Sequence, residues 1–161
     1  MWLRDRDSPT LASLTRRVSD FTGTSKSHQE AVQMLRYYRD QFYSAHLDAF
    51  DPKWYQGKID SIHHGHKNRL ATLFWYISDV SRGGETLFPR AYGLGQPSDP
   101  WECEKSKGLK VSPKRGNIIL WYNLLPNGVL DHNSLHSGCP VLEGTLSCTH
   151  HLVSILLFSY N

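Results

Sequence analysis

The chain has 161 residues, of which 39% are hydrophobic and 20% are charged, so it can bury one substantial core but is too short for two domains. The formal net charge is +3, and because the basic residues are scattered among acidic ones, the sequence does not indicate a nucleic-acid-binding protein. The longest apolar stretch, 152–158, is far shorter than the roughly 20 residues that cross a membrane, and no signal peptide or anchor is recognisable.

The first predicted element is an amphipathic helix. Ser8 followed by Pro9 is a helix-start signal, apolar residues then recur at helical spacing, and Gly23 supplies a stop. The next segment, 29–42, is ambiguous, because its apolar spacing fits a helix while its aromatic end fits a strand. Residue propensities alone favour a helix there.

Short strands are predicted from residue 69 onward. The β-branched and aromatic run 69–78 reads as a buried strand, and further strands are expected to end at 87–89 and to cover 108–111, 117–122 and 135–141. The segment 91–107 is rich in Gly, Pro, Ser and charge, so we expect a long excursion from the core. The fold class that follows is mainly β with a flanking helix (α+β), as an antiparallel sandwich or barrel.

One pair of side chains indicates a metal site. His46 and Asp48 are two residues apart, so on a strand they point to the same face. His136, from a distant strand, would complete a set of two histidines and one carboxylate. Such a set leaves half of an octahedron open, as in non-haem Fe(II) oxygenases. An isolated His-x-Asp pair also arises by chance, so the pair alone does not establish the site.

The remaining histidines and the cysteines have plainer interpretations. The cluster His63, His64 and His66 lies in a polar stretch that favours a solvated loop over a second metal site. A zinc hydrolase built on it would lack HExxH-like spacing. His132 follows an aspartate in a predicted turn and should face solvent. The three cysteines show no CxxC spacing, which argues against structural zinc and leaves a disulfide between two of them open.

Several motifs, in order, resemble the catalytic domain of prolyl 4-hydroxylases over residues 1–144. The matching segments are MLRY at 34–37, YSAHLDAF at 43–50, NRLAT at 68–72, SDV at 78–80, GGETLFP at 83–89, GLKV at 108–111, WYNL at 121–124 and LHSGCPV at 135–141. The resemblance implies a double-stranded β-helix, or jelly-roll, core, and it favours a strand rather than a helix around residue 35.

The resemblance also implies roles for single residues. Tyr37 would lie near 2-oxoglutarate and Thr86 would help to bind it, although both also suit ordinary strand positions. Tyr43 would stack on the peptidyl proline, or be a plain core aromatic, and Arg69 would contact the substrate peptide. The iron ligands would be His46, Asp48 and His136, and the positions that are disulfide-bonded in relatives are Cys103 and Cys139.

The implied activity is that of a procollagen-proline 4-dioxygenase type of enzyme. Fe(II), O2 and 2-oxoglutarate would hydroxylate peptidyl proline to 4-hydroxyproline and release succinate and CO2, with L-ascorbate restoring oxidised iron. The partner would be a proline-rich peptide or protein, because such chains favour extended polyproline II and dock on aromatic grooves. Relatives of this type work in the endoplasmic reticulum or Golgi lumen. Nothing in the sequence indicates an oligomeric state.

The resemblance fails near the end of the chain. Relatives carry a lysine ten residues after the distal histidine, where it pairs with the C5 carboxylate of 2-oxoglutarate, and this chain has Leu146. We therefore expect 145–161 to be a divergent tail, as in an alternatively spliced product, and the domain to be incomplete at its start. His150 or His151 would lie about 13–17 Å along a strand from the lysine position, too far to replace it. The alternative function is a non-catalytic relative that binds metal or proline-rich peptide.

Overall fold

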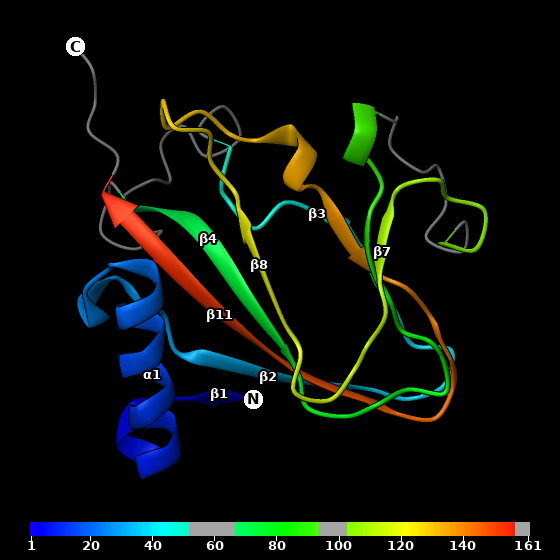
Figure 1. Ribbon diagram of the computed structural model, residues 1–161, viewed down its shortest axis with the longest axis horizontal. Coiled ribbons are helices and arrows are strands. Elements are labelled where there is room, and N and C mark those ends of the chain that lie inside the picture. The colour runs from blue at the N-terminus through cyan, green and yellow to red at the C-terminus, as the bar shows by residue number, and fades with distance from the viewer. Residues whose placement is uncertain (52–66, 94–102, 157–161) are drawn as a thin grey trace.

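Antiparallel strands make up most of the structure, a computed structural model that describes residues 1–51, 67–93 and 103–156 (Figure 1). The larger sheet has the strand order β1-β2-β11-β4-β8, formed by β1 (Trp2–Leu3), β2 (Val32–Tyr37), β11 (Leu146–Leu156), β4 (Lys67–Tyr76) and β8 (Ile118–Tyr122). The second sheet has the order β3-β9-β6-β7, formed by β3 (Tyr43–His46), β9 (His136–Gly138), β6 (Thr86–Phe88) and β7 (Leu109–Val111). A short pair, β5 (Arg82–Gly83) with β10 (Val141–Glu143), connects their ends.

The predicted helix is present as α1 (Pro9–Thr22). The hydroxyl of Ser8 accepts a hydrogen bond from the main-chain N–H of Leu11, and Gly23 ends the helix in the left-handed conformation. Val18, 2% exposed, packs with Leu73 and Val153 of the larger sheet. Figure 1 shows α1 against one face of this sheet, with the smaller sheet on the other side. No helix within the described residues is long and apolar enough to span a membrane.

The ambiguous segment 29–42 contains strand β2, so the preference for a helix from propensity is wrong and the preference from resemblance is confirmed. Strand β2 lies between β1 and β11, and both neighbours pair with its backbone. Pairing on two sides outweighs a local helix propensity of a few tenths of a kcal/mol per residue. Asp40, in the turn that follows, has a φ of 65°.

The segment from residue 145, expected to be a divergent tail, contributes β11, the central strand of the larger sheet. Strand β11 pairs with β2 and β4, so that Cys148 lies opposite both Leu35 and Tyr76. Because side chains alternate along a strand, Leu146 and His150 face the smaller sheet, while His151 and Val153 face α1. Residues 146–156 are therefore an internal part of the fold and do not lie at its edge.

Two other expectations differ in detail from the structure. The strands at 109–111 and 118–122 do not pair with each other, because β7 pairs with β6 and β8 pairs with β4, so the turn between them carries the chain from one sheet to the other. The strand expected at 135–141 is divided into β9 and β10. The histidines His63, His64 and His66 lie outside the described residues, and His132 is exposed as expected.

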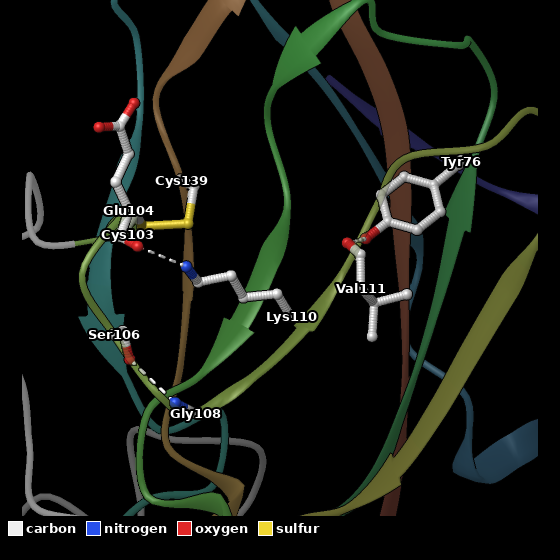
Figure 2. The surroundings of a disulfide bond; sticks show 8 residues. All are labelled: Tyr76, Cys103, Glu104, Ser106, Gly108, Lys110, Val111 and Cys139. Atoms are coloured by element: carbon white, nitrogen blue, oxygen red, sulfur yellow. Dashed lines mark hydrogen bonds between the residues drawn. A yellow bond between two sulfur atoms is a disulfide. The ribbon is translucent and has the colours of Figure 1, made fainter.

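Cys103 and Cys139 are joined by a disulfide (Figure 2). Cys139 directly follows β9, and its main-chain N–H donates to the carbonyl of Glu85. On the other side, Lys110 of β7 donates to the main-chain carbonyl of Glu104 at 3.1 Å. The disulfide thus ties the segment around residue 103 to the sheet that carries His136. Cys148 is free and buried.

Acid is expected to destabilise the fold through His151. This side chain is 1% exposed, its ring lies 5.5 Å from that of Trp75, and its Nδ1 has no hydrogen-bond partner among the described residues. Burial lowers the pKa of His151 to about 4, so the unfolded chain binds a proton there more readily than the folded chain. The free energy of unfolding should therefore fall by about 1–2 kcal/mol from this group between about pH 7 and pH 5.

Urea denaturation at the two pH values measures this effect. His151→Leu replaces the titrating group by an apolar side chain that suits the buried position. The free energy of unfolding of this variant should therefore depend less on pH than that of the unmodified chain. An exposed variant, His132→Leu, is the matched control and should keep the original dependence. An unchanged pH slope in His151→Leu would contradict the prediction.

Candidate metal centre

Three side chains, two on paired strands and one in the bend that follows the first strand, converge at one point. Strand β3 ends at His46, which lies opposite His136 of β9, and Asp48 follows in the bend after β3. The Nε2 atom of His46 is 3.5 Å from one carboxylate oxygen of Asp48, and the Nε2 atom of His136 is 3.7 Å from the other. One ligand atom from each residue lies within 4.8 Å of the others. The convergence expected from the sequence is present, although Asp48 lies beyond the end of the strand.

Both imidazoles are held so that Nε2 faces the carboxylate. Nδ1 of His46 is 2.8 Å from the carbonyl oxygen of Ser44, and Nδ1 of His136 is 2.9 Å from that of Ser134. An Nδ1–H that donates to a carbonyl leaves the Nε2 lone pair free for a metal ion. Burial lowers the pKa of His136, although Asp48 acts in the opposite direction, so the ring is in the neutral form that metals bind.

The buried Nε2 atom of His136 has no hydrogen-bond partner among the described residues. Buried polar atoms in native proteins are almost always paired, so an unpaired ring nitrogen that faces a carboxylate and a second imidazole calls for a cation. Two histidines and one carboxylate are the donors of facial Fe(II) sites. The residues present therefore fit a divalent iron.

Buried hydrogen bonds fix the carboxylate of Asp48. The hydroxyl of Thr72 donates to it at 2.6 Å, and the amide of Asn123 donates to that hydroxyl at 2.9 Å. Burial raises the pKa of Asp48, but the neighbouring imidazoles of His46 and His136 and the hydrogen bond from Thr72 together hold it well below its ordinary value. The carboxylate is therefore ionised and oriented before any metal binds.

Arg69 supports the same segment from outside the cavity. Its guanidinium makes a two-point ion pair with Glu30, at 2.8 and 3.0 Å, and donates to the main-chain carbonyl of Asp48 at 3.2 Å. The role expected from the sequence was contact with a substrate peptide, which stays a prediction. In the structure, Arg69 connects the metal-ligand segment to the larger sheet.

Thr72→Val should weaken metal binding without removing a ligand. The variant keeps the side-chain volume but leaves the carboxylate of Asp48 without its orienting donor, and loss of such outer-shell partners typically lowers metal affinity 10- to 100-fold, so we expect a loss of about that size. Titration with Mn(II), followed calorimetrically, measures the change. Thr149→Val is the matched control, since Thr149 is also buried but lies on the other face of the sheet. Equal affinities for the two variants would rule out an orienting role.

A narrow cavity of ≈ 30 Å³ opens beside the three residues. Its lining includes His46 and His136, as well as three of the side chains expected from the sequence, Tyr37, Tyr43 and Thr86. Arg69 is not part of this lining and instead borders a larger hollow near β1.

Sequence reasoning did not identify several residues of the site. Phe74 and Trp121 form an aromatic wall, with the Trp121 ring 4.6 Å from that of His136. His150 also lines the cavity, with its ring 4.7 Å from that of Phe74. The four-residue spacing from Leu146 to His150 places both on one face of a strand, and this signal was present in the sequence.

Known proteins resemble this chain over most of its length. Residues 32–155 match the 2OG-Fe(II) oxygenase superfamily. Prolyl 4-hydroxylase 13 of Arabidopsis thaliana is 37% identical over 138 residues, covering 86% of this chain and 47% of that protein. Prolyl 4-hydroxylase 2 of the same plant is 39% identical over 142 residues, covering 84% and 45%. The chain thus spans about half the length of the curated relatives it matches.

Solved structures show the same fold. A viral collagen prolyl hydroxylase from Paramecium Bursaria Chlorella virus-1, in its 2OG complex, superposes with a TM-score of 0.72 at 23% identity, covering 97% of this chain and 77% of that one. A prolyl-4-hydroxylase from Pseudomonas putida gives a TM-score of 0.54 at 15% identity, covering 89% and 62%. This likeness confirms the expected double-stranded β-helix. Because the family match extends over far more than half of the chain, this protein belongs to the 2OG-Fe(II) oxygenase superfamily.

Proposed function

We propose that this chain is the oxygenase domain of an enzyme that hydroxylates peptidyl proline to 4-hydroxyproline, with Fe(II) held by His46, Asp48 and His136. The observation that carries the proposal is the convergence of these three ligands around the buried Nε2 atom of His136, which no described residue partners. The plant relatives named as prolyl 4-hydroxylases support proline as the target.

The three ligands would occupy one face of the metal and leave the other face open to reactants. Iron bound there would supply the activation of dioxygen. Thr72 and Asn123 hold the carboxylate in place, so that the ligand set is preorganised. Phe74 and Trp121 give the cavity an apolar, aromatic lining.

Tyr43 suits the recognition of the peptide. Its side chain is 48% exposed, and its ring contacts that of His46 edge-on at 4.2 Å between centroids. A proline ring laid on Tyr43 would lie beside His46, one of the residues that would hold the metal. Aromatic surfaces of this kind bind proline-rich chains in the extended polyproline II conformation.

The second reactant expected from the family is 2-oxoglutarate, with Tyr37 and Thr86 as its proposed contacts. The end that chelates iron suits the open side of the triad. The far carboxylate does not suit the cavity, because no lysine or arginine lines it among the described residues. We propose ascorbate as the reductant and a secretory lumen as the compartment, which the Cys103–Cys139 disulfide supports.

A second candidate is a non-catalytic relative that binds metal or proline-rich peptide, and Leu146 in place of a cation favours it. An activity assay separates the two candidates. The chain is incubated with Fe(II), ascorbate, O2 and a proline-rich peptide, and one sample receives 2-oxoglutarate while another receives 2-oxopentanoate. The proposal expects the peptide to gain the mass of one oxygen atom per modified proline, and Asp48→Asn to abolish the gain. Peptide that stays unmodified in both samples, with metal bound, would select the non-catalytic candidate.

A further inference from the structure

The cavity beside the metal ligands ends at an apolar wall. Leu146, the first residue of β11, is 4% exposed and belongs to the same core cluster as Phe74 and Trp121. It pairs with Tyr37 across the strands, and its Cδ2 atom lies 3.5 Å from where a Cβ on Gly84 would be. A charged group placed against this wall would lose its water and gain no oppositely charged partner from the described residues that line the cavity.

Two neutral hydroxyls near Leu146, those of Tyr76 and Thr86, already use their hydrogens within the protein. The hydroxyl of Tyr76 donates to the carbonyl of Val111 at 3.1 Å, which uses its only hydrogen. The hydroxyl of Thr86, 2.6 Å from the Tyr76 oxygen, is then the donor in that contact. Thr86 can therefore donate a hydrogen bond to a carboxylate only if its hydrogen bond to Tyr76 is broken.

Tyr37 and His150 do not supply a positive charge either. Burial raises the pKa of Tyr37, so its phenol stays protonated and can donate one neutral hydrogen bond. His150 packs against Phe74, and burial lowers its pKa to about 4, so its ring is neutral near pH 7. Neutral donors hold a carboxylate less strongly than a lysine or arginine does.

Every 2-oxo acid has the same chelating end. The apolar wall around Leu146 can therefore discriminate only between the tails of different 2-oxo acids. On the basis of the proposed function, we propose that this cavity takes a monocarboxylic 2-oxo acid with a short apolar tail in preference to 2-oxoglutarate. The small free volume of the cavity favours a short tail over a long one. A tail that ends in a methyl group gains from apolar contact, whereas one that ends in a carboxylate must be desolvated.

Binding to the Mn(II)-loaded chain tests the preference without catalysis. The two probes are 2-oxopentanoate and 2-oxoglutarate, which share a five-carbon skeleton and differ only in a methyl or a carboxylate at C5. Calorimetric titration should show 2-oxopentanoate binding about 10- to 100-fold more tightly, the range expected when a charged group lacks a charged hydrogen-bond partner. Equal or tighter binding of 2-oxoglutarate would overturn the inference and leave the proposed function intact. Failure of both probes to bind would overturn both.

Two variants of Leu146 identify the residue responsible. Leu146→Lys introduces a cation at the wall and should reverse the preference toward 2-oxoglutarate. Leu146→Met keeps the volume and the apolar character, so it should keep the preference of the unmodified chain. Circular dichroism verifies folding, and if the lysine variant does not fold, the comparison of the two probes on the unmodified chain and on Leu146→Met still decides. A folded lysine variant with an unchanged preference would exclude Leu146 as the selecting residue.

Discussion

Asp48→Asn is expected to lower the affinity of the chain for Fe(II) or Mn(II) by more than about 100-fold, since loss of mere outer-shell partners already lowers metal affinity 10- to 100-fold. The substitution preserves shape and removes the negative charge. In the unmodified chain that charge lies between two imidazoles, with one oxygen near each Nε2 atom. The neutral amide offers a poorer ligand oxygen and leaves the charge of the cation uncompensated in a buried site.

Calorimetric titration with Mn(II) measures the loss, and the hydroxylation assay should lose its product in parallel. Asp20→Asn is the matched control, because Asp20 is exposed on α1 and should bind no metal of its own. Retained affinity in Asp48→Asn would remove Asp48 from the ligand set. Loss of affinity in both variants would show a global rather than a local effect.

Removal of the disulfide should have the largest effect on stability. Cys103 and Cys139 are 36 residues apart, and a closed loop of this size restricts the unfolded chain enough to stabilise the fold by about 3–4 kcal/mol. The double variant Cys103→Ser/Cys139→Ser should lose that amount in urea denaturation. Because Cys139 directly follows the strand of His136, metal affinity should fall as well.

A control with reductant distinguishes the loss of the disulfide from any effect of the serine side chains. The unmodified chain should lose stability when a thiol reductant is added, and the double variant should not change further. A double variant as stable as the unmodified, oxidised chain would contradict the prediction.

Sequence signals within a few residues predict those elements whose conformation is set by neighbouring residues. Helix α1 follows from a serine cap, an apolar stripe and a terminal glycine, each of which acts within one turn. Strand β2 could not be predicted this way, because its conformation depends on pairing with β11, more than a hundred residues away in the chain.

The metal site shows the same division. The spacing of His46 and Asp48 suggested their convergence, and His136 was expected from a distant strand. No local signal fixes its position, because strand pairing across the chain places it opposite His46. Thr72 and Asn123 lie in two of the matching segments, but the sequence did not indicate their roles, since their hydrogen bond exists only once β4 and β8 are side by side. His150 was missed because the motifs on which the resemblance rests end before its segment, whereas the family match extends to residue 155.

The position of β11 also governs how the domain can form. The strand made last among the described residues inserts between β2 and β4, so neither of those two can complete its pairing until residues 146–156 have left the ribosome. Such non-local pairing slows folding, and until β11 arrives the nascent chain exposes two open strand edges that other chains can join. Substitutions in β11 that weaken its pairing should therefore reduce the yield of soluble protein in cells more than their effect on the finished fold would suggest.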